Sequence, residues 1–312
     1  MRDELMNRYE VAVIGGGPAG LNAGLVLARS RRAVLVLDSG APRNSPADGV
    51  HGLLGHDGLP PAQLLERGRT EVRSYGGHVV SGDVTRASLR ADGFDLHLAD
   101  GRSVETSRLL VTTGVVDELP KIGGLQDRWG RDILHCPYCH GWEVRDKAIG
   151  VLGSGPNSAH QALLFRQLSE NVTYFTHMVP PDDDQTRDLT AREIRIVDGD
   201  VTSLAVNDDR LSGVRLSDGT VIGCEVLVVS TRLVARAGFL ADLGLKPSEH
   251  PSGLGEYILV DQAGQTEVPG VWAAGNVTDP AAQVGSSAAA GAAAAMRINA
   301  DLVAEEARLF KR

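Results

Sequence analysis

The six residues His-Cys-Pro-Tyr-Cys-His at 135–140 have the types and spacing best suited to redox chemistry in this chain. Two cysteines separated by two residues can close a small disulfide, and in an intracellular protein this spacing is typical of thiol–disulfide exchange. The attacking species in exchange is a thiolate, and a neighbouring histidine can lower a thiol pKa or carry its proton. We therefore expect Cys136, Cys139, His140 and His135 to be catalytic.

Three other interpretations of this stretch are open. Residues 136–140 match the C-x-x-C-H pattern of covalent haem attachment, although no export signal is visible. Zinc is a second alternative, but structural zinc sites usually draw ligands from two separated clusters, and the remaining cysteine, Cys224, stands alone in an apolar run. A structural disulfide is the third, and so short a loop would constrain the unfolded chain little. We expect no metal, and a buried, unreactive Cys224.

Length and composition indicate an ordinary globular protein. With 312 residues the chain exceeds the size at which one hydrophobic core usually stops growing, so two domains are expected. The formal charge of −9 argues against nucleic-acid binding and against a basic membrane-binding patch. No apolar run of about 20 residues could cross a bilayer, and residues 1–9 do not resemble a signal peptide. We expect a cytoplasmic protein whose paired cysteines cycle rather than stay bonded.

The N-terminal part of the chain contains the elements of a dinucleotide-binding unit. A short apolar run leads into Gly-Gly-Gly-Pro-Ala-Gly at 15–20, followed by an apolar helical stretch and a second strand that ends at Asp38. Gly15 permits a tight turn, Gly17 lets the backbone approach a pyrophosphate, and Gly20 allows close packing of helix on strand. The helix N-terminus supplies amide donors to the phosphates, and Asp38 would accept hydrogen bonds from ribose hydroxyls.

Three later features predict further parts of the same site. Residues 41–61 are rich in Gly, Pro, Asn, Asp and His, which predicts an extended loop over a ligand. A set of period-two strands ends in Thr-Gly at 113–114, at the carboxyl end of a strand, where such folds bind their ligands. An alanine-rich helix predicted at 283–302 follows Gly-Asn at 275–276, and its N-terminus offers backbone donors.

A second dinucleotide unit is predicted in the middle of the chain. A strand at 148–152 leads into Gly-Ser-Gly-Pro-Asn-Ser at 153–158, then an apolar helix and another strand. The pattern is weaker than the first, since Ser158 stands where glycine or alanine is usual. Three aspartates at 182–184 follow the second strand, where a site for NADPH normally offers arginines to the 2′-phosphate.

Together, the first glycine motif, Thr-Gly at 113–114, the C-x-x-C before a second glycine motif, and Ala-Gly-Asn at 274–276 resemble the low-molecular-weight thioredoxin reductase family over nearly the whole chain. The resemblance implies an α/β fold of two nested Rossmann-like dinucleotide-binding domains. An FAD domain would comprise residues 1–118 and 254–312, and an inserted pyridine-nucleotide-type domain, residues 119–253, would carry the C-x-x-C. It also implies a homodimer. The residues expected to contact FAD are Gly15, Gly17, Pro18, Ala19, Gly20, Asp38, Ser39, Arg43, Asn44, His51, Val84, Thr113, Gly114, Gly275, Asn276, Gln283 and Val284.

Three departures from the NADPH-dependent members of that family bear on function. His140 stands where they have an aspartate, Thr-His-Met at 176–178 stands where they have a His-Arg-Arg type run, and Asn276 stands where they usually have an aspartate. The string Cys-Pro-Tyr-Cys-His-Gly-Trp-Glu at 136–143 and the early loop with Asp-Gly-Leu-Pro at 57–60 more closely resemble the dithiol oxidases of holomycin and gliotoxin biosynthesis. Those enzymes use FAD to oxidise a small-molecule dithiol and pass the electrons to oxygen.

This resemblance implies a mechanism. A substrate dithiol would attack Cys136 of the disulfide, Cys139 would be the thiol next to the flavin, and dioxygen would yield hydrogen peroxide. His140, with His135 as the second candidate, would take protons from the thiols, a role typically worth about 10²- to 10⁴-fold. The apolar side chains in the loop at 49–61 indicate a small apolar ligand. Two alternatives stay open: a thioredoxin reductase-like enzyme supplied by NADPH, NADH or a ferredoxin-like partner, and a non-catalytic flavin redox sensor.

Overall fold

A computed structural model describes residues 5–309, and the chain divides into two compact units. Unit 1 comprises Met1–Ser45, Leu59–Val116 and Leu233–Arg312, and unit 2 comprises Pro46–Gly58 and Asp117–Arg232. Residues 1–4 and 310–312, which belong to the expected FAD domain, lie outside the described residues. Residues 1–4 are also part of the segment 1–9 that was compared with a signal peptide. The chain passes between the units through β7 (Val115–Glu118) and β16 (Arg232–Ala235), which pair with each other.

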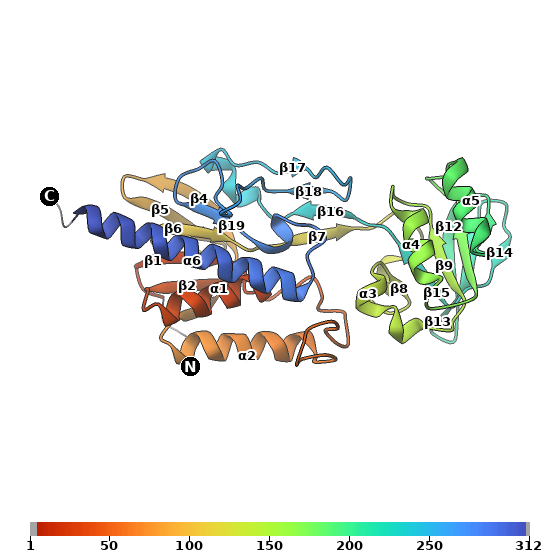
Figure 1. Cartoon of the computed structure of the whole chain (residues 1–312), viewed down its shortest axis with the longest axis horizontal. Coiled ribbons are helices and arrows are strands. Elements are labelled where there is room, and N and C mark those ends of the chain that lie inside the picture. Colours follow the sequence, from red (N-terminus) through yellow and green to blue (C-terminus); the bar gives the residue numbers. More distant parts are fainter. Residues whose placement is uncertain (1–4, 310–312) are drawn as a thin grey trace. The chain divides into compact units, whose positions relative to one another are not determined.

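Unit 1 is built on a mixed sheet with the strand order β3-β2-β1-β6-β5-β4, and β19 also pairs with β6 (Figure 1). Its strands are β1 (Arg8–Ile14), β2 (Val34–Asp38), β3 (His78–Ser81), β4 (Val84–Arg90), β5 (Gly93–Leu98), β6 (Ser103–Val111) and β19 (Val271–Ala273). The strands β3, β2, β1, β6 and β19 run parallel to one another. Their carboxyl ends therefore meet at one edge of the sheet, which is the edge where such folds bind ligands.

Helices cover one face of this sheet (Figure 1). They are α1 (Pro18–Arg29), α2 (Pro61–Ser74) and α6 (Val284–Leu309). Their buried side chains, such as Leu27, Val72 and Ile298, form one core cluster with the sheet. On the other face, Phe94 and Leu240 belong to a second cluster that includes the strands β4 and β5. The predicted alanine-rich helix is confirmed, and it extends beyond residue 302 to Leu309.

Small residues let α1 and α6 approach closely. A Cβ added at Gly291 of α6 would lie 2.0 Å from the carbonyl oxygen of Ala19 in α1, so no larger side chain fits there. Ala294 and Ala295, also on α6, are buried. The alanine-rich composition of this helix therefore serves close packing against the helix that follows the first glycine motif.

The remaining elements of unit 1 are short. They are the 3₁₀ helices η3 (Gly238–Leu243) and η4 (Gly275–Val277) and the strand pair β17 (Ser248–Glu249) and β18 (Glu256–Tyr257). The backbone of η4 begins at Gly275, whose φ of +82° suits glycine.

Unit 2 contains a parallel sheet with the order β11-β10-β9-β15-β8. Its parallel strands are β8 (Ile133–Leu134), β9 (Ile149–Leu152), β10 (Val172–Phe175), β11 (Arg195–Val197) and β15 (Val226–Val229). Its helices are η1 (Gln126–Arg128), α3 (Pro137–His140), η2 (Trp142–Val144), α4 (Ser158–Phe165) and α5 (Asp183–Ala191). A second sheet joins β12 (Val201–Asn207), β13 (Arg210–Leu216) and β14 (Val221–Ile222). The expected α/β class with Rossmann-type units is confirmed.

One short segment of unit 2 comes from an earlier part of the chain. Residues 46–58 follow β2 in sequence but cluster with residues 117–232. Gly130 has no room for a side chain, because a Cβ there would lie 2.4 Å from Cβ of Pro46. The predicted loop at 41–61 is thus divided between the two units.

None of the helices described between residues 5 and 309 is long and apolar enough to cross a membrane. In the same part of the chain, no group of three or more His, Cys, Asp or Glu side chains comes together as a metal site.

Candidate active site

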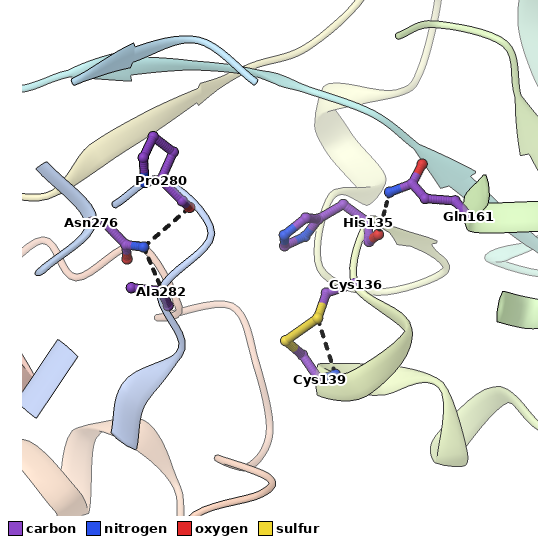
Figure 2. The surroundings of a disulfide bond; sticks show 7 residues. All are labelled: His135, Cys136, Cys139, Gln161, Asn276, Pro280 and Ala282. Atoms are coloured by element: carbon purple, nitrogen blue, oxygen red, sulfur yellow. Dashed lines mark hydrogen bonds between the residues drawn. A yellow bond between two sulfur atoms is a disulfide. The ribbon is translucent and has the colours of Figure 1, made fainter. Parts of the chain in front are cut away.

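Cys136 and Cys139 form a disulfide at the start of α3 (Figure 2). Cys136 is the N-cap residue, and its sulfur accepts a hydrogen bond from the backbone amide of Cys139 at 3.2 Å. Pro137 suits the first helical position, because its fixed φ matches the helix and it lacks an N–H that would need a partner. Both cysteines are partly exposed, so an exchange partner can reach the disulfide.

His140 ends the same short helix and has unusual surroundings. Both its ring nitrogens are buried, and neither has a hydrogen-bond partner within residues 5–309. Burial lowers the pKa of His140 below its usual value, and His51 lowers it further, while Glu143 and Asp48 oppose the shift. The imidazole is therefore neutral at pH 7 and has a free lone pair, which is the state that accepts a proton.

His51 contacts the redox segment through Glu143. Its Nε2 lies 3.5 Å from Oε1 of Glu143 in η2, and its Nδ1 lies 3.5 Å from Oδ2 of Asp57. The Asp57 carboxylate also accepts a hydrogen bond from the amide of Gly52 at 3.0 Å, and this bond is the main reason that its pKa is lowered. Two carboxylates therefore flank His51, and its expected contact with FAD stays a prediction.

His135 lies immediately before the disulfide. Its backbone carbonyl accepts a hydrogen bond from Nε2 of Gln161 at 2.8 Å (Figure 2), and its ring stacks at a tilt on Trp129 with 5.9 Å between centroids. Both contacts fix the chain that enters Cys136. The four catalytic candidates thus lie on one continuous segment, and their individual roles stay predictions.

The third cysteine is confirmed as a buried residue. Cys224 is 3% exposed, and burial raises the pKa of its thiol to about 12. A thiol that stays protonated at neutral pH is a poor nucleophile.

The first glycine motif forms a cradle between β1 and α1 that fits a dinucleotide pyrophosphate. A Cβ at Gly20 would lie 1.8 Å from the carbonyl oxygen of Gly15, and a Cβ at Gly15 would lie 2.4 Å from that of Thr112. The Thr112 hydroxyl donates to the Gly15 carbonyl at 2.9 Å and fixes the turn. A Cβ at Gly17, by contrast, would meet nothing within 4 Å. Gly15 and Gly20 thus provide close packing, while Gly17 faces open space that a phosphate can approach.

Asp38, at the end of β2, borders this cradle. A Cβ at Gly16 would lie 2.3 Å from Cγ of Asp38. The carboxylate accepts hydrogen bonds from the amide of Gly40 at 2.9 Å and from Nε and Nη2 of Arg69 at 3.1 and 2.8 Å. Since a carboxylate offers about four acceptor positions, Asp38 retains capacity for a ribose hydroxyl.

Other FAD candidates lie where neighbouring parallel strands end. Thr113 and Gly114 follow β6, with the Thr113 hydroxyl donating to the Arg236 carbonyl at 2.7 Å. Gly275 follows β19, and Asn276 uses its side-chain amide to donate to the carbonyl of Ala282 at 2.7 Å (Figure 2). The fold therefore brings these strand ends to the same edge of the sheet as the glycine cradle.

The remaining candidates are more scattered. Pro18 and Ala19 begin α1, Val284 begins α6, and Gln283 directly precedes it, whereas Ser39, Arg43 and Asn44 lie in the loop after β2. Val84 packs in the core of unit 1 and is 8% exposed. Each assignment to FAD contact stays a prediction.

The second glycine motif, between β9 and α4, is bonded to the protein itself. The hydroxyl oxygen of Ser158 accepts hydrogen bonds from the amides of Ser154 and Gly155 at 3.2 and 3.1 Å. Ser158 is fully buried. A serine at this position therefore uses amides that the loop of a dinucleotide site would offer to phosphate.

Comparison with known proteins places the chain in a family. Residues 9–296 match the family described as pyridine nucleotide-disulphide oxidoreductase. The chain is 31% identical over 290 residues to thioredoxin reductase tcpT of Claviceps purpurea, covering 86% of this chain and 87% of that protein. It is 29% identical to thioredoxin reductase sirT of Leptosphaeria maculans, with 93% of each covered.

Two solved structures are also similar. The crystal structure of HlmI matches with a TM-score of 0.91 and 44% identity, covering 99% of this chain and 97% of that one. An oxidoreductase from Agrobacterium tumefaciens matches with a TM-score of 0.88 and 35% identity, covering 95% and 99%. The chain belongs to the pyridine nucleotide-disulphide oxidoreductase family. It is thus a thioredoxin reductase-like FAD-dependent oxidoreductase, in agreement with the resemblance seen in the sequence, and the glycine cradle of unit 1 fits that cofactor.

The structure adds three residues to the site that no sequence pattern indicates. Arg69 pairs with Asp38, Glu143 contacts His51, and Gln161 binds the carbonyl of His135. Each partner is distant in sequence or lies on another element, and no motif indicates the pairing. Of the three, only Glu143 lies in a sequence motif, the eight residues 136–143 that resemble the dithiol oxidases.

Proposed function

We propose that this protein oxidises a small-molecule dithiol to an intramolecular disulfide, with dioxygen as the acceptor of two electrons and two protons and hydrogen peroxide as the second product. The observation that carries the proposal is the self-bonded glycine motif of unit 2. Ser158 accepts the hydrogen bonds of the Ser154 and Gly155 amides, so these donors are not available to a nicotinamide dinucleotide. This arrangement favours entry of electrons from the thiol side.

The charge of the segment after β10 supports the same direction of electron flow. The segment 177–186, which follows β10, has no arginine and contains three aspartates. Asp182 caps α5 by accepting from the amide of Gln185 at 2.8 Å, and Asp183 and Asp184 are exposed in its first turn. Arg187, the next residue, pairs with Asp184, and the net negative charge that remains disfavours a 2′-phosphate.

The disulfide and His140 can carry out the thiol chemistry. A substrate thiolate attacks the sulfur of Cys136, the S–S bond breaks, and Cys139 leaves as thiolate. The second substrate thiol then attacks the substrate sulfur of the mixed disulfide and releases Cys136. The sulfur of Cys136 already accepts a hydrogen bond from the Cys139 amide. Neutral His140 takes up a thiol proton. FAD, when bound, supplies the two-electron chemistry that returns the pair to the disulfide and delivers the electrons to dioxygen.

Exposed apolar side chains next to the disulfide in sequence, and one in the segment 46–58, favour a small apolar substrate. Tyr138, between the cysteines, is 68% exposed, and Trp142, three residues after Cys139, is 66% exposed. Leu54, in the segment 46–58 of unit 2, is fully exposed. Apolar surface of this kind suits a hydrophobic ligand.

A reductase is the second candidate, because the similar proteins tcpT and sirT are named thioredoxin reductases. In that case a nicotinamide or a protein donor would reduce the flavin, and electrons would leave through Cys139 and Cys136. A homodimer, a cytoplasmic location and the division into an FAD domain and an inserted domain stay predictions from the sequence.

The test is anaerobic bleaching of the flavin absorbance, with NADPH, NADH or a small dithiol such as dithiothreitol added in separate cuvettes. We expect bleaching by dithiol alone, reversed repeatedly by air with hydrogen peroxide formed at each cycle. Cys136→Ser should abolish bleaching, and Cys224→Ser should not. Rapid bleaching by micromolar NADPH or NADH would refute the proposal in favour of a reductase, and a single oxidation without turnover would favour a sensor.

A further inference from the structure

Gln161 links the disulfide segment to the interior of unit 2. Its side chain projects from α4 and donates through Nε2 to the carbonyl oxygen of His135 at 2.8 Å (Figure 2). That carbonyl belongs to the peptide bond between His135 and Cys136. The other end of the Gln161 amide, Oε1, accepts from the hydroxyl of Ser230 at 2.7 Å.

The chain of hydrogen bonds continues to the second glycine motif. The Ser230 hydroxyl lies 3.3 Å from that of Ser158, which accepts from the amides of Ser154 and Gly155. Because Ser230 donates to Gln161, Ser158 must donate to Ser230. Every bond then points the same way, from the loop amides through two hydroxyls and one carboxamide to the His135 carbonyl. Such chains are mutually polarising, so each bond strengthens the next.

The sheet explains why these residues meet. The strands β9, β15 and β8 are neighbours in the parallel sheet. Ser230 directly follows β15, His135 directly follows β8, and Ser154 lies two residues after β9. The strand β8 is at the edge and has only two residues, so its ladder holds the chain beyond it weakly. A second contact, between the Ser154 hydroxyl and the backbone of Ser230 at 3.0 Å, ties β9 to β15. The chain of hydrogen bonds therefore anchors the exit from a short edge strand.

We propose that Gln161 is a positioning residue for the redox disulfide, and that the glycine motif of unit 2 acts as the fixed end of this support. The bond to His135 fixes the peptide plane before Cys136. That plane determines where the Cys136 sulfur lies relative to the Cys139 amide, 3.2 Å away. Holding the two together stabilises the Cys136 thiolate.

This inference deepens the proposed function, since it concerns the same disulfide, but it holds for either direction of electron flow. Its test therefore uses neither oxygen, nicotinamide nor substrate. In the Cys139→Ser protein, Cys136 is the single thiol of the pair, and the buried Cys224 stays unreactive. The rate of alkylation by iodoacetamide against pH then reports the pKa of the Cys136 thiol.

Gln161→Leu removes the hydrogen bonds to the His135 carbonyl and to the Ser230 hydroxyl, and it should raise the pKa of Cys136. We expect alkylation at pH 7 to slow about three- to tenfold, the factor that one buried hydrogen bond is typically worth. Ser230→Ala deletes one hydroxyl and should give a smaller change of the same sign. The matched control is Gln167→Leu, which changes an exposed glutamine just beyond α4 and should leave the profile unchanged.

An unchanged pH profile in a folded, flavin-containing Gln161→Leu protein would overturn the inference. If that variant does not fold, Ser230→Ala decides: a profile identical to that of the parent counts against the support, and a raised pKa counts for it. Equal slowing in Gln167→Leu would also overturn it, because the effect would then not depend on the His135 carbonyl. The outcome of the bleaching experiment affects none of these results.

Discussion

Replacing Gly17 by alanine separates cofactor binding from folding. Gly17 precedes α1 with φ of −78° and ψ of −174°, a conformation that alanine adopts without strain. A Cβ there would meet nothing within 4 Å of the protein. The variant should therefore fold normally, and by restricting the unfolded chain it should gain about 0.4–1 kcal/mol in the free energy of unfolding of the apoprotein.

The same methyl group should weaken FAD binding. It would occupy the space through which the backbone approaches the pyrophosphate. Loss of one hydrogen bond to a charged group costs about 1.5–3 kcal/mol, so we expect the dissociation constant to rise about ten- to hundredfold. Gly20→Ala is the matched contrast, because its Cβ would lie 1.8 Å from the Gly15 carbonyl and 2.6 Å from the Thr112 hydroxyl. Overpacking of this kind should cost the apoprotein about 1–3 kcal/mol or more.

The assay uses flavin-free protein for both variants. Urea unfolding followed by circular dichroism gives the free energy of unfolding, and quenching of flavin fluorescence gives the dissociation constant of FAD. Gly17→Ala with parental FAD affinity would refute the placement of the pyrophosphate at this cradle. A destabilised Gly17→Ala apoprotein would refute the claim that Gly17 faces open space.

Two further predictions concern titratable groups. Burial raises the pKa of Cys224 to about 12. Native reduced protein should therefore react promptly with Ellman's reagent at two of its three cysteines, and at the third only after denaturation. Prompt reaction of all three cysteines would contradict this prediction. Burial lowers the pKa of His140 below 6.5, so the unfolded chain binds its proton more readily, and stability from this residue is lost as pH falls through 6.5 toward the lower native pKa. His140→Phe should flatten the decline of urea midpoints below pH 6.5, and an unchanged decline would contradict the assignment.

Features that depend on neighbouring residues were predictable from the sequence. The turn at Gly15, the C-x-x-C that opens α3 and the helix after Gln283 are each fixed by local backbone geometry, and each is found. Pro18 and Pro137 begin their helices because proline fits the first helical turn.

Features that depend on strand order were not predictable. Whether Ser230 reaches Ser158 depends on β15 lying beside β9, which no local pattern reveals. The serine at position 158 looked like a weak form of a glycine motif, and only its hydrogen bonds show that it occupies the loop amides. The contact of His51 with Glu143 is likewise indicated by no local pattern, and the expected contact of His51 with FAD stays a prediction.

The sequence by itself determined the chemistry available to this protein: a pair of cysteines able to form a disulfide, histidines beside it, and a glycine turn shaped for a dinucleotide. These follow from residue type and from spacings of a few residues, over which the backbone geometry is fixed. The tertiary structure alone decided what surrounds these groups. Burial left His140 neutral and without a hydrogen-bond partner among residues 5–309, and the order of the strands connected a second glycine motif to the disulfide. Burial and partnership between distant residues arise only when the sheets assemble.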